Sequence, residues 1–157
     1  MKIHIRKADI SQLDVIIEWR IKVLKEVFFL PDDYDMTLLY NESRCYYKKN
    51  LLNEMHTTVF AYNGNNIIGC GSICYQNELP SPDNLNGKCG YLMNIYTIPE
   101  YRKKGVGKKI VEFLTQDARS RNICKLSLES SSLGEKLYLS TGFKKNSSFY
   151  IKYLNEA

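Results

Sequence analysis

The sequence has little of what metal sites, membrane spans and disulfide scaffolds require. It contains only two histidines, His4 and His56, with no H-E-x-x-H motif and no Cys/His cluster, which argues against a zinc site. The uncharged stretch at residues 55–77 is interrupted by an Asn-Gly-Asn-Asn turn, so it lacks the roughly 20 continuous apolar residues of a membrane span. Residues 1–10 have no apolar core of the length that a signal peptide needs. We therefore expect a soluble, cytoplasmic protein.

The cysteines and the overall composition narrow the class further. The five cysteines are an odd number without a C-x-x-C pair, which favours reduced thiols, and we expect most of them to be buried as small apolar residues. A chain of 157 residues that is 44% hydrophobic predicts one domain, over residues 1–157, with a sizeable core. The net charge of +5 favours anionic partners, without distinguishing nucleic acid from a phosphorylated small molecule.

Hydrophobic periodicity predicts a mixed α/β chain. Strands are expected at residues 3–7, 57–62, 67–75, 89–98 and 125–129, with a final pair at 143–145 and 148–153. Helices are expected from Asp9 or Ser11 to Pro31 and at residues 36–55, 105–122 and 134–140. This order implies a mixed sheet covered by helices on both faces.

Residues 102–109 contradict the normal rules for a helix N-terminus. Five of the eight are Lys or Arg, whereas the helix dipole favours acidic residues there, and the usual capping residue is missing. A bound phosphate would accept the free N–H groups and neutralise the cations, and Gly105 and Gly107 would let the backbone approach it closely. The alternative is a solvated basic loop. Walker A and dinucleotide motifs are excluded, because Arg102 and Ile110 stand where these motifs need glycine.

The pattern R-x-x-G-x-G at residues 102–107, after a strand ending in Thr-Ile-Pro-Glu-Tyr, resembles the coenzyme A loop of the GNAT superfamily of acyl-CoA N-acyltransferases. Residues 137–143 (LYLSTGF) are similar to a second signature of that family, LY…GF. The resemblance implies the GNAT fold, a central mixed, mostly antiparallel sheet with helices on both faces. It also implies direct transfer of an acetyl group from acetyl-CoA to a primary amine of a small molecule or peptide.

The resemblance also implies roles for particular residues. Tyr138 corresponds to the general acid that protonates the departing CoA thiolate; the alternative is that its ring only packs against the sheet. The backbone of Ile95, Tyr96 and Thr97 corresponds to positions that contact pantetheine and the acyl carbonyl. The loop that holds the pyrophosphate corresponds to Arg102, Lys103, Lys104, Gly105, Val106, Gly107 and Lys108. The family often has Asn seven residues before the acid, where this chain has Ser131, and the usual Ala is Gly134.

The residues that handle the acceptor are not fixed by the sequence. Glu129 is a candidate proton acceptor, directly or through water, or else a solvated carboxylate at a strand end. Asn94 either orients substrate or is an ordinary polar residue within a strand. Trp19 and Tyr34 either line an acceptor pocket or, for Trp19, pack in the core. We expect the first two helices and the loop at residues 76–88 to shape that pocket.

Two other functions stay open. A nucleic-acid-binding module would use the basic loop on backbone phosphates, but it would need a wider basic face, and the other Lys and Arg are interspersed with Asp and Glu. A CoA-binding sensor or inactive acyltransferase would keep the loop without turnover, against which the presence of Tyr138 argues. No metal is expected, and a monomer and a homodimer are both compatible with the sequence.

Overall fold

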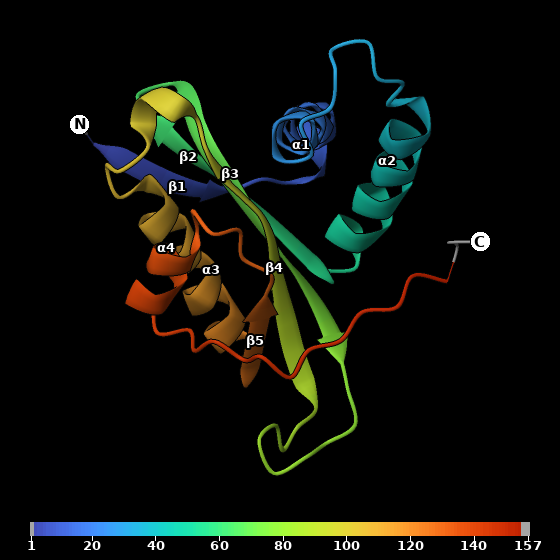
Figure 1. The fold of residues 1–157 in the computed structure, drawn as a ribbon, viewed down its shortest axis with the longest axis vertical. Helices are drawn as coiled ribbons and strands as arrows, with labels where there is room; N and C mark the ends of the chain where they lie inside the picture. Colours follow the sequence, from blue (N-terminus) through green and yellow to red (C-terminus); the bar gives the residue numbers. More distant parts are fainter. Residues whose placement is uncertain (1, 155–157) are drawn as a thin grey trace.

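A computed structural model describes residues 2–154, in which a five-stranded sheet has helices on both faces (Figure 1). The strands are β1 (Ile3–Lys7), β2 (His56–Asn63), β3 (Asn66–Asn77), β4 (Lys88–Thr97) and β5 (Lys125–Leu128). The helices are α1 (Leu13–Val27), α2 (Thr37–Leu52), α3 (Val106–Ser120) and α4 (Glu135–Ser140), with short 3₁₀ turns η1 (Ile10–Gln12) and η2 (Pro99–Tyr101). The strands are ordered β1-β2-β3-β4-β5, with only the β4–β5 pair parallel. The predicted mixed, mostly antiparallel sheet is confirmed.

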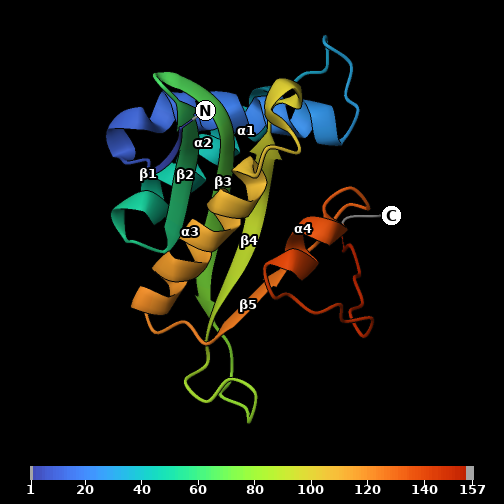
Figure 2. The ribbon, with the colours of Figure 1, turned by 90° about the vertical axis from the view of Figure 1, so that its left-hand side faces the viewer.

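Side chains alternate across the sheet and build a core on each face. Val59 and Ala61 of β2 face α3, where Leu114 is fully buried, whereas Phe60 between them faces α1 and packs with Ile17. Figure 2 shows α3 crossing one face of the sheet, with α1 and α2 behind the other. The two faces are therefore separate environments, each closed by its own helices.

A bulge in β4 is centred on Asn94. Cys70 of β3 pairs with Tyr96 and Ser72 pairs with Met93, so β4 contains one more residue than β3 between these two pairs. Asn94 adopts the left-handed conformation, with φ of +57°. The extra residue reverses the alternation of side chains in the rest of β4.

The parallel strands β4 and β5 pair only over the first half of β4. The register runs from Cys89–Lys125 to Leu92–Leu128, after which the two strands diverge (Figure 2). Residues 93–97 of β4 therefore have β3 on one side and, within residues 2–154, no strand on the other. Such an edge offers backbone N–H and C=O groups to an extended ligand.

The predicted final strands at residues 143–145 and 148–153 are wrong, because the structure is irregular there. Asn146 Oδ1 accepts a hydrogen bond from Ser148 N at 3.0 Å, which makes a local turn between the two expected strands. A single backbone hydrogen bond, from Phe143 N to Tyr138 O, connects residues 143–154 to the rest of the described chain. A pattern of alternating apolar residues does not form a strand without a partner edge.

The prediction that most cysteines are buried was also wrong. Cys70 and Cys89 are buried and Cys74 is half-buried, but Cys45 and Cys124 are exposed. Cys45 is exposed because α2 buries only Tyr47 and leaves most of its length to solvent. No helix among residues 2–154 has both the length and the apolar content needed to cross a membrane.

Candidate functional site

The basic loop with the expected phosphate site connects η2 to the start of α3, beyond the C-terminal end of β4 (Figure 2). Gly105 is the N-cap of α3, with φ of +81°. An added Cβ there would meet no atom within 4 Å, so the left-handed backbone conformation, and not a lack of space, requires glycine. Lys103 is also in the left-handed region, with φ of +57°. The loop thus turns sharply into the helix without a side-chain cap.

The first turn of α3 leaves its backbone donors free. Lys109 N donates to Gly105 O at 3.1 Å and begins the helical hydrogen bonds. Within the described chain, the N–H groups of Val106, Gly107 and Lys108 donate to no carbonyl and no side chain. The lysines at 103, 104 and 108 are exposed around this turn. Free N–H groups and positive charge therefore occur together, which is the chemistry that a phosphate ester matches.

Arg102 is held differently from these lysines. Its Nε donates to Thr97 O at 3.0 Å, its Nη2 forms an ion pair with Glu26, and its guanidinium lies 5.6 Å from the centre of the Tyr96 ring. Glu26 also accepts a hydrogen bond from the Tyr96 hydroxyl. Partial burial opposes ionisation of Glu26, but the hydrogen bonds from Tyr96 and Arg102 outweigh it and lower the pKa of the carboxyl. The last turn of α1 therefore clamps Arg102, a contact that the sequence did not reveal.

Gly107 has a packing role in addition to the one expected from the sequence. A Cβ at this position would lie 3.1 Å from Cδ2 of Leu137 and 3.9 Å from Oγ1 of Thr97. Because Leu137 precedes Tyr138 in α4, this close contact sets how near α4 lies to the first turn of α3. The glycine thus helps to place the candidate acid beside the loop.

Tyr138 is half-buried, and its hydroxyl has no hydrogen-bond partner among residues 2–154. Its ring meets Phe143 edge-on, with centroids 6.0 Å apart. A Cβ on Gly134 would lie 3.0 Å from Cε2 of Tyr138, so glycine in place of the family's alanine gives the ring room. Burial raises the pKa of Tyr138, with a smaller contribution from Tyr91. The hydroxyl is thus protonated at neutral pH, as a proton donor must be.

Glu129 and Ser131 lie in the exposed segment between β5 and α4. Burial raises the pKa of Tyr91, and the negative charge of Glu129 beside it raises that pKa further. Tyr91 also lies close enough to affect Tyr138, so the structure brings these three residues together. Ser131 O accepts from Gly134 N at 3.0 Å, and its hydroxyl has no partner in the part of the chain described.

A cavity of about 430 Å³ lies on the face of the sheet covered by α1 and α2. It is lined by Arg20, Glu42, Ser43, Tyr46, Tyr47, His56, Cys74 and Met93. Met93 directly precedes the bulge residue Asn94, whose Oδ1 accepts a hydrogen bond from Arg20 Nη1 at 3.1 Å. The cavity thus reaches the point where β4 loses its pairing with β5.

Asn94 contacts the cavity residue Arg20, and its role in orienting substrate stays a prediction. The other expected acceptor residues do not line this cavity. Trp19 packs edge-on against Phe60 and Tyr96, with centroids 6.0 and 6.3 Å away, which confirms core packing. Tyr34 is half exposed. The expected loop at residues 76–88 does not line the cavity either, whereas both helices do.

A chain of hydrogen bonds runs from this cavity into the sheet. Tyr46 Oη lies 3.0 Å from His56 Nδ1, His56 Nε2 lies 3.0 Å from Thr58 Oγ1, and Thr58 Oγ1 lies 3.0 Å from Ser72 Oγ. Burial lowers the pKa of His56 to about 4, and the charge of Arg20 contributes, so the imidazole is neutral at pH 7. No role for these residues was predicted from the sequence, because they come from separate elements and match no motif. Nowhere in residues 2–154 do three His, Cys, Asp or Glu side chains gather as metal ligands would.

Comparison with known proteins agrees with the motifs. The family model described as the acetyltransferase (GNAT) family matches residues 18–143. A Clostridium acetobutylicum protein, described as a predicted acetyltransferase with acetyl-CoA, is 27% identical with a TM-score of 0.86, over 98% of this chain and 97% of that one. A GCN5-related N-acetyltransferase from Ralstonia eutropha JMP134 is 18% identical with a TM-score of 0.82, over 97% of this chain and 99% of that one, which shows a shared fold.

A curated relative covers less of the chain. The uncharacterized N-acetyltransferase YsnE of Bacillus subtilis (strain 168) is 28% identical over 89 residues, which is 54% of this chain and 53% of that protein. The chain thus matches about half the length of this relative.

Proposed function

Because this chain belongs to the GNAT acetyltransferase family, we propose that it transfers an acetyl group from acetyl-CoA to a primary amine of a small molecule or peptide. The observation that carries the proposal is the meeting of three features at one end of β4. These are the unpaired edge at residues 93–97, the free N–H groups at the start of α3, and Tyr138 on α4.

Coenzyme A fits the residues present. The N–H groups of Val106, Gly107 and Lys108, with the lysines beside them, would hold its diphosphate. The edge of β4 at Ile95, Tyr96 and Thr97 would pair with the amides of its pantetheine arm. When bound, acetyl-CoA supplies an activated thioester. The relative described with acetyl-CoA supports this assignment.

The proposed reaction takes place beside the unpaired edge of β4. The amine forms a bond to the thioester carbonyl carbon, the carbon–sulfur bond breaks, and Tyr138 gives its proton to the departing thiolate. With ordinary pKa values this proton transfer is uphill by roughly 2 kcal/mol. Burial raises the pKa of Tyr138, so the transfer requires desolvation to raise the pKa of the CoA thiol by more than it raises that of the phenol.

The proton of the attacking amine needs an acceptor at neutral pH. His56 suits this task poorly, because both of its ring nitrogens are already hydrogen-bonded, Nδ1 with Tyr46 and Nε2 with Thr58. We assign the role to Glu129, beside Tyr91 and Tyr138, acting directly or through water. The cytoplasmic location expected from the sequence is part of this proposal, and a CoA-binding sensor is the alternative.

A thermal-shift experiment followed by an assay of CoA release tests the proposal. Acetyl-CoA at 100 times its dissociation constant is expected to raise the melting temperature by about 5–10 °C, and polynucleotide to leave it unchanged. Stabilisation by polynucleotide alone would instead favour nucleic-acid binding. Free CoA should then appear with at least one member of a panel of amines. Stabilisation by acetyl-CoA without CoA release from any amine would favour the sensor.

A further inference from the structure

Arg20 of α1 is a half-buried cation without an acidic partner. Within residues 2–154 it forms no ion pair, and its one side-chain hydrogen bond runs from Nη1 to Asn94 Oδ1. The N–H groups on its Nε and Nη2 therefore donate no hydrogen bond to any described side chain. Partial burial removes hydration from a guanidinium, so an unpaired one is costly unless a ligand pairs with it.

The charge of Arg20 acts on the interior of the 430 Å³ cavity. The Arg20 guanidinium is a neighbouring positive charge for four titratable side chains: His56, Tyr46, Tyr47 and Cys70. None of these four groups is ionised at neutral pH, because burial favours their neutral forms. Glu42, the one acid that lines the cavity, is exposed and forms no ion pair with Arg20. Arg20 is therefore a positive charge in the cavity wall without an ion-pair partner among the described residues.

The position of this charge relates it to the proposed reaction. Asn94, which holds Arg20, forms the bulge where the edge of β4 becomes free, and that edge is the proposed seat of the thioester. A group bound to Arg20 would thus lie near the acetyl carbonyl. Resting on the proposed function, we propose that the acceptor is a small amine that also carries an acid group, and that this acid pairs with Arg20.

The chemistry of the cavity favours a carboxylate or a phosphate as that acid group. A guanidinium donates two parallel hydrogen bonds to either one, which a neutral amine cannot match. The cavity volume suits a molecule the size of an amino acid or a phosphorylated amino sugar. Polyamines and other purely cationic acceptors are disfavoured, because Arg20 repels them.

Matched acceptors test this inference and distinguish the two acid groups. We would measure KM and kcat for an amino acid and its amide, and for an amino sugar with and without its phosphate. Wild type should favour the acidic member of at least one pair by 10-fold or more in kcat/KM. In Arg20→Gln, KM for that acid should rise about 10-fold or more with kcat changed less than about 3-fold, and the neutral partner should be unaffected. Arg20→Lys should retain part of the preference.

Arg119→Gln is the matched control, since Arg119 is exposed in the last turn of α3, on the opposite face of the sheet. This control should keep the wild-type preference. Equal rates for acidic and neutral amines in wild type would overturn the inference. So would an equal fall of kcat for every amine in Arg20→Gln, because that would mean Arg20 only positions Asn94.

Failure of the proposed function would give a different result from failure of this inference. If no amine releases CoA, titration calorimetry of the same pairs with the CoA-loaded protein decides the matter. Tighter binding of the acidic amine, lost in Arg20→Gln, would support acid recognition in a protein that is not a transferase. Equal binding of both members of each pair would overturn it.

Discussion

Tyr138 shows how one residue combines packing with chemistry. Its ring packs against Phe143 and occupies the space that Gly134 leaves free. Its hydroxyl has no hydrogen-bond partner in the described chain. A tyrosine that served only to fill the core would gain from a hydrogen bond once half-buried. The free hydroxyl therefore fits the role of a proton donor to a bound ligand.

Tyr138→Phe separates the two roles, because it keeps the ring and removes the proton. We expect kcat to fall by about 10²–10³-fold, while the free energy of unfolding changes by less than about 1 kcal/mol. Steady-state CoA release and urea denaturation measure the two effects. Tyr150→Phe is the control, because Tyr150 is 91% exposed. A loss of stability with unchanged kcat would assign Tyr138 to packing alone.

At the scale of elements, α1 is tied to the basic loop that precedes α3. Glu26 in its last turn holds Arg102 and also accepts a hydrogen bond from Tyr96 of β4. A diphosphate bound at the start of α3 would compete with Glu26 for the same guanidinium. This competition would couple donor binding to the position of α1, which also carries Arg20, through one ion pair.

Glu26→Gln weakens this competition, so we expect it to tighten CoA binding by about 2- to 5-fold, as for a partly exposed ion pair. The gain should shrink with rising salt, because screening weakens the pair in wild type. Titration calorimetry with CoA at two salt concentrations measures it. Glu18→Gln, two turns earlier on α1, removes an acid without an ion pair and should leave affinity unchanged. Weaker CoA binding in Glu26→Gln would mean that the clamp positions Arg102 for the ligand.

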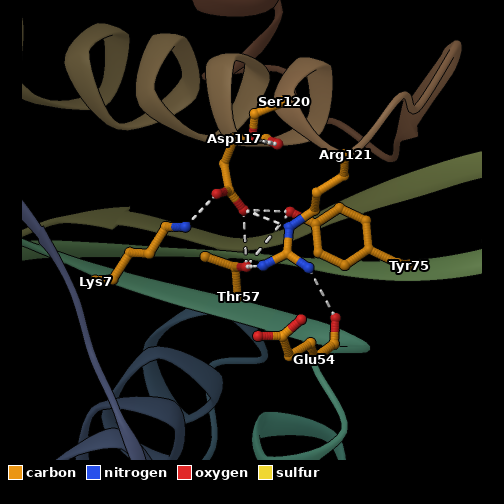
Figure 3. A network of polar contacts seen from close by, with 7 residues as sticks. All are labelled: Lys7, Glu54, Thr57, Tyr75, Asp117, Ser120 and Arg121. Atoms are coloured by element: carbon orange, nitrogen blue, oxygen red, sulfur yellow. Dashed lines mark hydrogen bonds and ion pairs between the residues drawn. The ribbon is translucent and has the colours of Figure 1, made fainter.

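For the whole molecule, a buried carboxylate joins α3 to three strands (Figure 3). Asp117 accepts hydrogen bonds from Thr57 of β2 at 2.9 Å and Tyr75 of β3 at 2.6 Å, and it pairs with Lys7 of β1 and with Arg121. Burial opposes ionisation of Asp117, but the hydrogen bonds from Lys7, Tyr75 and Thr57 outweigh it and lower its pKa to about 2. The network closes the end of α3 opposite to the basic loop.

This lowered pKa makes stability depend on acid. Since the folded pKa lies below the unfolded value of about 3.9, the ionised form stabilises the fold above that pH. The contribution is lost as the pH falls from about 4 to about 2. Asp117→Asn should therefore lower the free energy of unfolding by about 2–4 kcal/mol at pH 7, and the difference from wild type should narrow below pH 4.

Urea denaturation at pH 7 and pH 3 measures both effects of Asp117→Asn. Asp14→Asn is the control, because Asp14 is largely exposed and, among the described residues, forms its ion pair with Arg44 on the surface. Its denaturation midpoint should match wild type. An Asp117→Asn protein as stable as wild type at pH 7 would show that the buried charge costs as much as its partners return.

Prediction from the sequence succeeded where the interacting residues are close along the chain and failed where they are far apart along it. The bounds of α3 and the hairpin of β2 and β3 follow from periodicity within one segment, and the structure confirms them closely. The final strands failed because a strand needs a partner edge, which no local pattern specifies. The bulge at Asn94 was missed because it depends on the register between β3 and β4.

The sequence by itself determined the order of the elements from β1 to α4, the family and the basic loop before α3, because each depends on residues close together along the chain. The tertiary structure alone decided that Arg20 meets Asn94, that Glu26 meets Arg102 and that Lys7 meets Asp117, across separations of 74, 76 and 110 residues. It also decided that β4 and β5 diverge, which opens the edge. The physical reason is that burial, charge pairing and strand pairing are properties of neighbours in space, and folding chooses those neighbours.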